Sequence, residues 1–436
     1  MAKGKKEYLS LEDLLEQAVV KEEEQPYEVP SNWVWTRLGN LSQVKGGKRL
    51  PKGHFLIEEK TDCPYIRVTD FKELTIDVDN VKYLNKDTQK LINNYTISCE
   101  DVYISIAGTI GKVGIIPIEL DGANLTENAA KITQLSGTDK KYLMYLLKSD
   151  QLQHQIKDST LATTQAKLAL FRIAEFKVPL PPLAEQQRIV ERLESLFEKL
   201  DAAKELVQNA LDSFENRKAA ILHKAFTGEL TAKWREENGV SFDSWEKKPF
   251  KEFCLLKRGY DLPAQSRISG EYPLVSSSGI IDTHNERKVQ GPGIVTGRSG
   301  TIGRVHYIEN DFWPLNTTLY SQKLFGNVPK YIYYYLMTFD FKTYSSSTAV
   351  PTLNRNLFLD VPIKVPNIRE QEEIVCILDK LLASEQQAQE LCNIIEKIDL
   401  MKKAILARAF RGELGTNNPE EESAIELLKE VLKEKL

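Results

Sequence analysis

A heptad pattern of apolar residues is the strongest signal in this chain, and it begins near the middle of the sequence. Apolar side chains recur at alternating spacings of four and three, which is the a/d pattern of a coiled-coil helix. The positions are Ile189, Leu193, Leu196, Leu200, Ala203, Val207, Ala210, Phe214, Arg217 and Ile221, with Arg217 as the polar interruption. Pro181 and Pro182 precede this segment and Gly228 follows it, so we expect a helix of about 40 residues, roughly 60 Å long.

A second heptad segment lies near the C-terminus and repeats the first. Residues 181–190 and 366–375 share the pattern Pro-x-x-x-Glu-Gln-x-x-Ile-Val at an offset of 185, and both segments close on Gly-Glu-Leu, at 228–230 and 412–414. The offset at this close is 184, so the second copy has lost one residue. Its a/d positions shift phase accordingly, from Ile374, Leu378, Leu381 and Ala388 to Leu391, Ile395, Ile398 and Ile405. A period this long indicates a duplicated domain rather than a repeat array.

The stretch before each heptad segment mixes short β-like runs with glycine-rich turns, which predicts an α+β lobe in which strands predominate. In the first lobe we expect strands at Pro64–Val68, Val102–Ile106 and Val113–Ile118, and a helix at Tyr142–Ile156. A fainter repeat links the two lobes, because Trp33, Gly47 and the Gly-Thr-Ile-Gly run at 108–111 match Trp245, Gly259 and 300–303. Between these anchors the lobes share little sequence. We therefore expect a common framework with different surfaces.

These patterns predict an α+β protein with two globular lobes in a pseudo-two-fold arrangement, separated by an antiparallel two-helix coiled-coil spacer. The helices are expected to be antiparallel because the first leads from one lobe to the other and the second must then run back. The expected segments are an N-terminal amphipathic segment at 1–30 with a helix over 9–24, a first lobe at 31–178, a first spacer helix at 179–230, a linker at 231–243, a second lobe at 244–363, a second spacer helix at 364–414 and a C-terminal helical tail at 415–436.

Composition places the chain among ordinary globular proteins, with 42% hydrophobic and 28% charged residues. No apolar run approaches the 18 or so residues of a membrane span, and no secretion signal is apparent, so no membrane association is expected. The five cysteines are scattered without a Cys-x-x-Cys pair, which is typical of reduced thiols in a cytoplasmic protein.

The net charge of −4 hides an uneven distribution along the chain. Counted as Lys and Arg minus Asp and Glu, residues 31–172 carry +3 and residues 244–360 carry +4, while the helical stretches are acidic. Local charge determines what a surface attracts, so the lobes suit an anionic partner better than the total suggests. A chance fluctuation in a surface of mixed sign is the alternative explanation.

Basic and polar residues in the lobes are candidates for binding double-stranded DNA. Four cations fall between Lys45 and Lys52 without an intervening acid, and arginines flank the second glycine-rich anchor. Arginine forks suit guanine edges and phosphates. The candidates are Lys45, Lys48, Arg49, Lys52, Arg67, Lys112, Lys257, Arg258, Tyr260, Arg267, Arg298, Ser299 and Arg304. Each alone has a simpler explanation as a solvated side chain, and the glycine-rich anchors also fit plain structural turns.

Motifs for catalysis are missing from the sequence. The methyltransferase tetrad is absent, since Leu180-Pro181-Pro182-Leu183 fails at both ends, and no Gly-x-Gly-x-x-Gly run is present. Gly108–Lys112 lacks the remaining features of a phosphate loop, and the five histidines show no metal-ligand spacing. We therefore expect neither catalytic nor metal-binding residues in this chain.

Taken together, these residues resemble the specificity (S) subunit of type I restriction–modification systems. The resemblance runs from about Trp33 to Leu414. It rests on the duplicated Glu-Gln-x-x-Ile-Val start motif, on the Ala-Phe-x-Gly-Glu-Leu close at 225–230 and 409–414, and on the Gly-x-Ile-Gly anchors. The second start motif departs from the family pattern, because Asn367 and Ile368-Arg369 replace part of its proline run.

The resemblance implies that each lobe is a target recognition domain that reads one half of a bipartite DNA site, while the helices set the gap. It also implies docking of two modification (methyltransferase) subunits and association with restriction subunits that act as an ATP-dependent translocase and nuclease. This chain would bind no cofactor itself, and S-adenosylmethionine, ATP and Mg would belong to the partners. Two alternatives remain: a self-contained DNA methyltransferase, and a coiled-coil scaffold that does not bind DNA.

Overall fold

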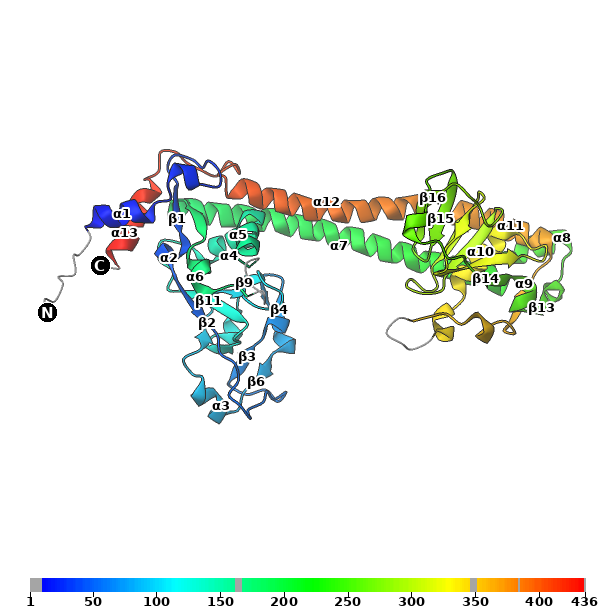
Figure 1. Cartoon of the computed structure of the whole chain (residues 1–436), viewed down its shortest axis with the longest axis horizontal. Coiled ribbons are helices and arrows are strands. Elements are labelled where there is room, and N and C mark those ends of the chain that lie inside the picture. Colours follow the sequence, from blue (N-terminus) through cyan, green and yellow to red (C-terminus); the bar gives the residue numbers. More distant parts are fainter. Residues whose placement is uncertain (1–9, 161–166, 346–350, 383–384, 435–436) are drawn as a thin grey trace. The chain divides into compact units, whose positions relative to one another are not determined.

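The structure is a computed structural model that describes residues 10–160, 167–345, 351–382 and 385–434, with the side chains of 385–389 left undescribed. The chain forms two compact units (Figure 1). Unit 1 contains residues 1–205 and 394–436, and unit 2 contains residues 206–393. Each unit thus combines one lobe with parts of both heptad segments.

Unit 1 contains a four-stranded antiparallel sheet of order β2-β11-β8-β9 and a second sheet of order β6-β3-β10-β7, in which β3 and β10 are parallel. Its strands are β1 (Val34–Arg37), β2 (Gln43–Gly46), β3 (Pro64–Ile66), β4 (Phe71–Lys72), β5 (Thr75–Ile76), β6 (Lys82–Tyr83), β7 (Thr96–Ile97), β8 (Val102–Ser105), β9 (Val113–Ile115), β10 (Ala123–Leu125), β11 (Ala129–Thr133) and β12 (Lys177–Leu180). Its shorter helices are α1 (Leu11–Ala18), α2 (Leu38–Leu41), α3 (Lys86–Leu91), α4 (Lys140–Lys148), α5 (Asp150–Thr160), α6 (Leu170–Ala174) and α13 (Ala424–Lys433).

Unit 2 repeats this design, with a four-stranded antiparallel sheet of order β14-β20-β17-β18 and a second sheet of order β16-β15-β19 whose β15 and β19 are parallel. Its strands are β13 (Glu246–Pro249), β14 (Leu255–Arg258), β15 (Tyr272–Ser276), β16 (Gly279–His284), β17 (Gly293–Gly297), β18 (Val305–Ile308), β19 (Trp313–Pro314), β20 (Thr318–Lys323) and β21 (Pro362–Val365). Its shorter helices are α8 (Ala232–Asn238), α9 (Phe250–Phe253) and α10 (Pro329–Thr338).

The shared framework explains the repeated glycines. A Cβ atom at Gly47 would lie 2.1 Å from the carbonyl oxygen of Thr126, and one at Gly259 would lie 2.2 Å from that of Leu315. In both units, therefore, only glycine lets the backbone after the first strand of the four-stranded sheet, β2 or β14, approach the neighbouring segment. The predicted duplication of the lobes is confirmed by the common strand order.

The first spacer helix is α7 (Leu183–Thr227), a single helix of 45 residues (Figure 1). Its predicted seam is correct at Ile189 and Leu193, which are fully buried, but wrong at Ala210 and Arg217, which are exposed. Leu211 and Lys218 are half-buried in their place. The reason is helix geometry, because 3.6 residues per turn drift by about 20° per heptad. After three heptads, the following residue points closer to the original direction.

The second heptad segment forms α11 (Ile368–Leu382) and α12 (Glu385–Ala409), and residues 383–384 lie outside the described part. In α11 the prediction is wrong at Leu381, which is 45% exposed, whereas Leu382 is buried. Ala388 lies among the residues whose side chains are not described. The predicted later phase agrees with α12, where Ile398 is buried.

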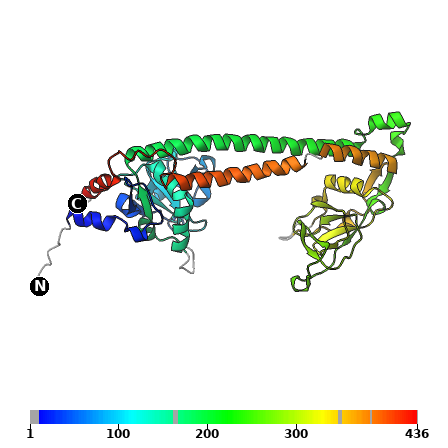
Figure 2. The ribbon, with the colours of Figure 1, turned by 90° about the horizontal axis from the view of Figure 1, so that it is seen from above.

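Within unit 1, the start of α7 and the end of α12 run antiparallel, side by side (Figure 2). Lys204 Nζ lies 2.7 Å from Asp399 Oδ1, and Lys402 pairs with Asp201 three residues earlier on α7. The pairing partners therefore advance in opposite directions along the two helices, as expected for antiparallel packing. In unit 2, Leu222 and Ala225 of α7 share a core with Ile374 and Leu378 of α11.

Several predicted elements in the first lobe have different bounds. The single helix expected at Tyr142–Ile156 is wrong, because α4 and α5 are separated at Ser149, whose extended backbone (φ −62°, ψ 149°) ends α4. The strands β3, β8 and β9 end earlier than predicted. The helix expected over 9–24 reaches only Ala18, followed by a short 3-10 turn at Glu22–Glu24. None of the helices in the described ranges combines the length and the apolar composition of a membrane span.

Candidate nucleic-acid interface

The basic run in unit 1 begins at Lys45 within the edge strand β2 and continues into the segment after it. Lys45, Lys48, Arg49 and Lys52 are all exposed, as DNA contact requires. The guanidinium Nε of Arg49 lies 2.6 Å from Glu127 Oε1, and Lys48 Nζ lies 5.3 Å from the ring centroid of Tyr95. These contacts partly hold two of the four cations in place. Their binding to DNA stays a prediction.

Arg67 differs from the other candidates of unit 1, because its side chain is engaged within the fold. It donates to both carboxylate oxygens of the fully buried Asp70, at 2.6 and 3.1 Å, and to the carbonyl oxygen of Asn80 at 2.8 Å. This geometry gives Arg67 a structural role that the sequence did not reveal. Lys112 is exposed, and its backbone N–H donates to Ser105 Oγ at 2.8 Å.

The candidates of unit 2 fall into two groups. Tyr260 is half-buried and its side chain is engaged within the fold, because its hydroxyl lies 3.1 Å from that of Tyr320 and its ring packs edge-on against Trp313. Arg267 is half-buried, and its Nε has no hydrogen-bond partner among the described residues. The remaining candidates lie at the surface or at its edge: Lys257 and Arg304 are exposed, Ser299 is half-buried, and Arg258 and Arg298 line a pocket.

That pocket has a volume of about 360 Å³ and brings together residues that are distant in sequence. Its lining consists of Arg258, Arg298, Leu319, Thr352, Leu353, Asn354, Arg355 and Asn356. The sequence had singled out Arg258 and Arg298 separately, whereas Arg355 and its asparagine neighbours were missed. Aligning them with residues 169–171 at the offset of 185 could have pointed to them, because both stretches follow a matching leucine, Leu168 or Leu353.

The repeated Glu-Gln pair of the start motifs has a structural role in both units. In unit 2, Glu370 is fully buried and accepts hydrogen bonds from Thr231 Oγ1 (2.7 Å), Arg235 Nη1 (2.6 Å) and Trp245 Nε1 (3.0 Å). Its neighbour Gln371 accepts from the backbone N–H of Val328 and donates to the Pro366 carbonyl. The bonds of Glu370 thus attach the start of α11 to the segment that follows α7, and Gln371 attaches it to the residue before α10.

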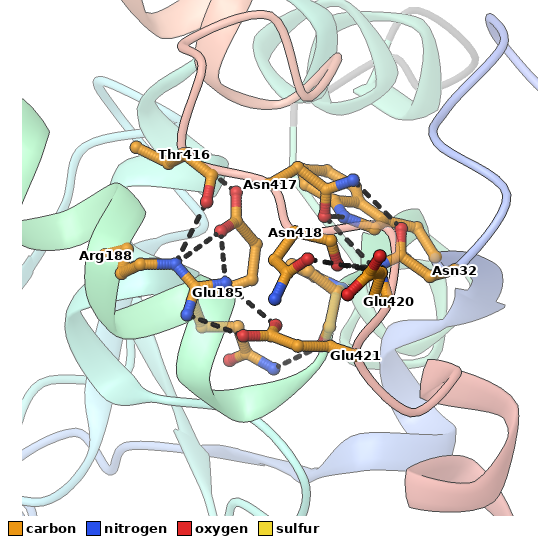
Figure 3. A network of polar contacts seen from close by, with 11 residues as sticks. Asn32, Glu185, Arg188, Thr416, Asn417, Asn418, Glu420 and Glu421 are labelled. Atoms are coloured by element: carbon orange, nitrogen blue, oxygen red, sulfur yellow. Dashed lines mark hydrogen bonds and ion pairs between the residues drawn. The ribbon is translucent and has the colours of Figure 1, made fainter.

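Unit 1 builds the equivalent network from the start of α7 and from segments near the two ends of the chain (Figure 3). Glu185 accepts from Thr416 Oγ1 at 2.6 Å and from Arg188 Nε at 3.0 Å, and Arg188 forms two 2.8 Å bonds with the carboxylate of Glu421. Asn417 bonds reciprocally with Asn32. Thr416 and Thr231 both follow a Gly-Glu-Leu close, so the two networks use equivalent segments.

Two carboxyl groups in this network have pKa values displaced in opposite directions. Burial raises the pKa of Glu185 above its ordinary value of 4.5, although the hydrogen bonds from Thr416 and Arg188 lower it. The hydrogen bond from Arg188 lowers the pKa of Glu421, which is more exposed. Both carboxyl groups thus contact Arg188, but the buried Glu185 binds a proton more readily than it would in the unfolded chain.

This displacement predicts opposite pH dependences for two matched variants. Since Glu185 binds its proton more tightly when folded, its contribution to the free energy of unfolding should fall as pH rises above 4.5. Glu421 should contribute stability that is lost as pH falls below 4.5. Urea unfolding between about pH 4 and pH 6 measures the difference in free energy of unfolding between wild type and each variant. This difference should decrease with rising pH for Glu185→Gln and increase with rising pH for Glu421→Gln. Parallel curves for both variants would contradict this assignment.

The two units together define a class of protein: one mixed α+β domain built twice on long helices, with different residues exposed on each copy. A comparison with known families gives the family itself. The family described as type I restriction modification DNA specificity domain matches residues 30–211 and again residues 243–397. The chain belongs to this family, as the resemblance of its motifs had indicated.

Individual relatives agree with this assignment. The Type I restriction enzyme EcoBI specificity subunit of Escherichia coli is 29% identical over 215 residues, which covers 48% of this chain and 44% of the relative. The chain thus matches about half the length of this relative and of the EcoDI specificity subunit. The EcoKI specificity subunit of Escherichia coli K12 is 23% identical over 459 residues, covering 93% of this chain and 96% of the relative.

A solved structure shares the fold. A chain from work on the "Structural basis underlying complex assembly and conformational transition of the type I R-M system" aligns with a TM-score of 0.66 at 18% identity. The alignment covers 89% of this chain and all of that chain. It confirms the mixed α+β fold class.

Proposed function

We propose that this chain is the DNA-reading specificity subunit of a type I restriction–modification complex, with one target recognition domain for each half of a bipartite site. The observation that carries this proposal is the repeated four-stranded sheet, β2-β11-β8-β9 and β14-β20-β17-β18, whose framework is common while its exposed side chains differ. Two domains with the same framework but different surface residues suit a DNA site whose two halves differ in sequence.

The chemistry of the complex would then reside in its partners. Two modification subunits would dock on the repeated helical framework and transfer methyl groups from S-adenosylmethionine, and restriction subunits would supply ATP- and Mg-dependent cleavage. This chain would contribute recognition, and its helices would set the gap between the half-sites. The buried Glu-Gln pairs support such a scaffold role, because their hydrogen bonds go to neighbouring segments of the fold.

Methylome sequencing of cells with and without the gene provides the test. A bipartite motif should be methylated only when the chain is present together with a modification subunit. The purified complex should bind that motif selectively, and its affinity should fall steeply with salt, by a log–log slope of about −0.9 for each phosphate contacted.

Two outcomes would replace the proposal with another function. Methyl transfer by the purified chain alone would identify a self-contained methyltransferase. A folded complex without sequence-selective DNA binding, and with a flat salt dependence, would identify a scaffold protein.

A further inference from the structure

One backbone position that the two units share carries an apolar residue in unit 1 and a charged residue in unit 2. In unit 1 the backbone N–H of Ile106 donates to Asn128, and its carbonyl accepts from Leu168, at 2.8 and 2.9 Å. In unit 2 the N–H of Arg298 donates to Thr317 and its carbonyl accepts from Leu353, both at 2.8 Å. The hydrogen bonds are thus the same, so Arg298 stands where unit 1 has Ile106.

Two neighbouring positions repeat this contrast. Gly46 precedes the close-packed Gly47 just as Arg258 precedes Gly259. Leu170 follows Leu168 by two residues, as Arg355 follows Leu353. Unit 1 therefore places isoleucine, glycine and leucine where unit 2 places three arginines. In unit 1 the Leu170 side chain reaches this space, since a Cβ at Gly46 would lie 3.4 Å from its Cδ1.

In unit 2 the same place is the 360 Å³ pocket, which we call the arginine pocket: Arg258, Arg298, Asn354, Arg355 and Asn356 around Leu319 and Leu353. Leu319 and Leu353 are buried, while Arg258, Asn354 and Asn356 are exposed. The pocket therefore has polar groups beside an apolar part, the composition of a ligand site.

The charges of the arginine pocket are not balanced within the fold. Arg258 Nη2 lies 3.3 Å from Asp261 Oδ1, which also accepts from Asn316. Arg355 Nη1 donates to the carbonyl oxygen of Leu256 at 2.8 Å, which fixes its guanidinium without neutralising it. Among the described residues, no carboxylate lies within ion-pair distance of Arg298 or Arg355. Gathering like charges costs energy unless a negative or electron-rich group approaches them.

We propose that the arginine pocket binds a hydrogen-bond acceptor group of duplex DNA, through Arg298 and Arg355, and that it distinguishes the recognition of unit 2 from that of unit 1. This rests on the proposed function. The guanidinium fork fits both a backbone phosphate and the O6 and N7 atoms of guanine. The pocket in either case gives unit 2 a contact that the isoleucine and leucine of unit 1 cannot make.

The framework itself supplies the variants that test this proposal. Arg298→Ile and Arg355→Leu introduce the residues that unit 1 carries at the same backbone positions, so we expect the double variant to fold. The control is Lys233→Ala on α8, which removes a cation whose side chain is 87% exposed. Each protein is assayed as the full chain in complex with its modification subunits, on duplexes containing the motif that the methylome defines.

The double variant should bind the motif about 10- to 100-fold more weakly, and the control should bind as wild type does. If the acceptor is a guanine, one base position in the half-site of unit 2 should become degenerate. If it is a phosphate, binding to all sequences should weaken alike, and the salt slope should become shallower by about one for each lost contact. Wild-type affinity, slope and selectivity in the double variant would overturn the proposal.

A measurement on the wild-type complex covers the case in which the double variant does not fold. Arginine-selective modification followed by mass spectrometry should find Arg298 and Arg355 protected by the cognate duplex, and Arg408 of unit 1, whose side chain is 64% exposed, unprotected. Equal modification of Arg298 and Arg355 with and without bound DNA would overturn the proposal. Failure of the wild-type complex to bind DNA selectively would instead overturn the proposed function.

Discussion

Exchanging residues 250–361 for the corresponding part of a relative should change one half of the methylated motif and leave the other half as it was. The exchanged part leaves and re-joins the chain through a two-stranded stem, in which β13 pairs antiparallel with β21, from Glu246 opposite Val365 to Pro249 opposite Pro362. The stem stays in place, and the relative should also retain the contacts that the exchanged part makes with α11, such as the hydrogen bond from the Val328 N–H to Gln371, so that the helical framework is not disturbed. Methylome sequencing of cells that express the exchanged chain reads the outcome directly.

Unit 1 offers the matched control for this exchange. There β1 pairs antiparallel with β12, from Val34 opposite Leu180 to Arg37 opposite Lys177, so residues 38–176 form the equivalent part. Exchanging them should change the other half of the motif. If either exchange alters both halves while the protein remains folded, the two domains do not read DNA independently.

Replacing Glu370 by alanine should destabilise unit 2 by about 3–5 kcal/mol, the typical cost of removing one partner from a buried ion pair. Glu370 is fully buried, and its loss removes the only carboxylate paired with the guanidinium of Arg235 among the described residues and leaves the indole N–H of Trp245 without its acceptor. The Arg235 side chain is only 10% exposed, so water cannot readily take the place of the carboxylate. Urea unfolding measures this loss of stability: the midpoint urea concentration should fall, while the dependence of the free energy on urea concentration stays unchanged.

Two further variants make this measurement specific. Glu372→Ala changes an exposed residue of the same helix and should alter stability by no more than about 0.5 kcal/mol. Glu370→Gln keeps an acceptor oxygen but removes the charge, so its effect should fall between the two alanine variants. A loss for Glu370→Ala no larger than that for Glu372→Ala would show that the network does not stabilise unit 2.

The helices and the duplication were predictable because their signals are local or repeated. An apolar residue every three or four positions describes one helix face, whatever that face meets later. The prediction of α7 therefore holds over its length, but fails at Ala210 and Arg217, where small angular drift accumulates. The break at Ser149 was missed because both α4 and α5 continue the same apolar spacing, and a single residue with extended backbone separates them.

The candidate site was predictable only in part. Arg258 and Arg298 stood out because each lies beside a recognisable anchor, while Arg355 follows no motif. Conversely, the sequence grouped Arg67 and Tyr260 with the surface residues, and the fold places their side chains against Asp70 and Tyr320. A residue's type shows what it can bind, but its neighbours across the fold determine what it does bind.

The sequence by itself determined that this protein is a duplicated α+β chain with long heptad helices, because periodicity and repetition are properties of the chain alone. Only the tertiary structure decided where its polar chemistry lies. Arg258, Arg298 and Arg355 meet because strand pairing brings β14, the turn after β17 and the segment after Leu353 together. Likewise, Glu185 accepts a hydrogen bond from Thr416 only because folding brings these distant segments together. Hydrogen bonds and charges act over a few ångströms in space, so sequence separation cannot reveal which of them will combine.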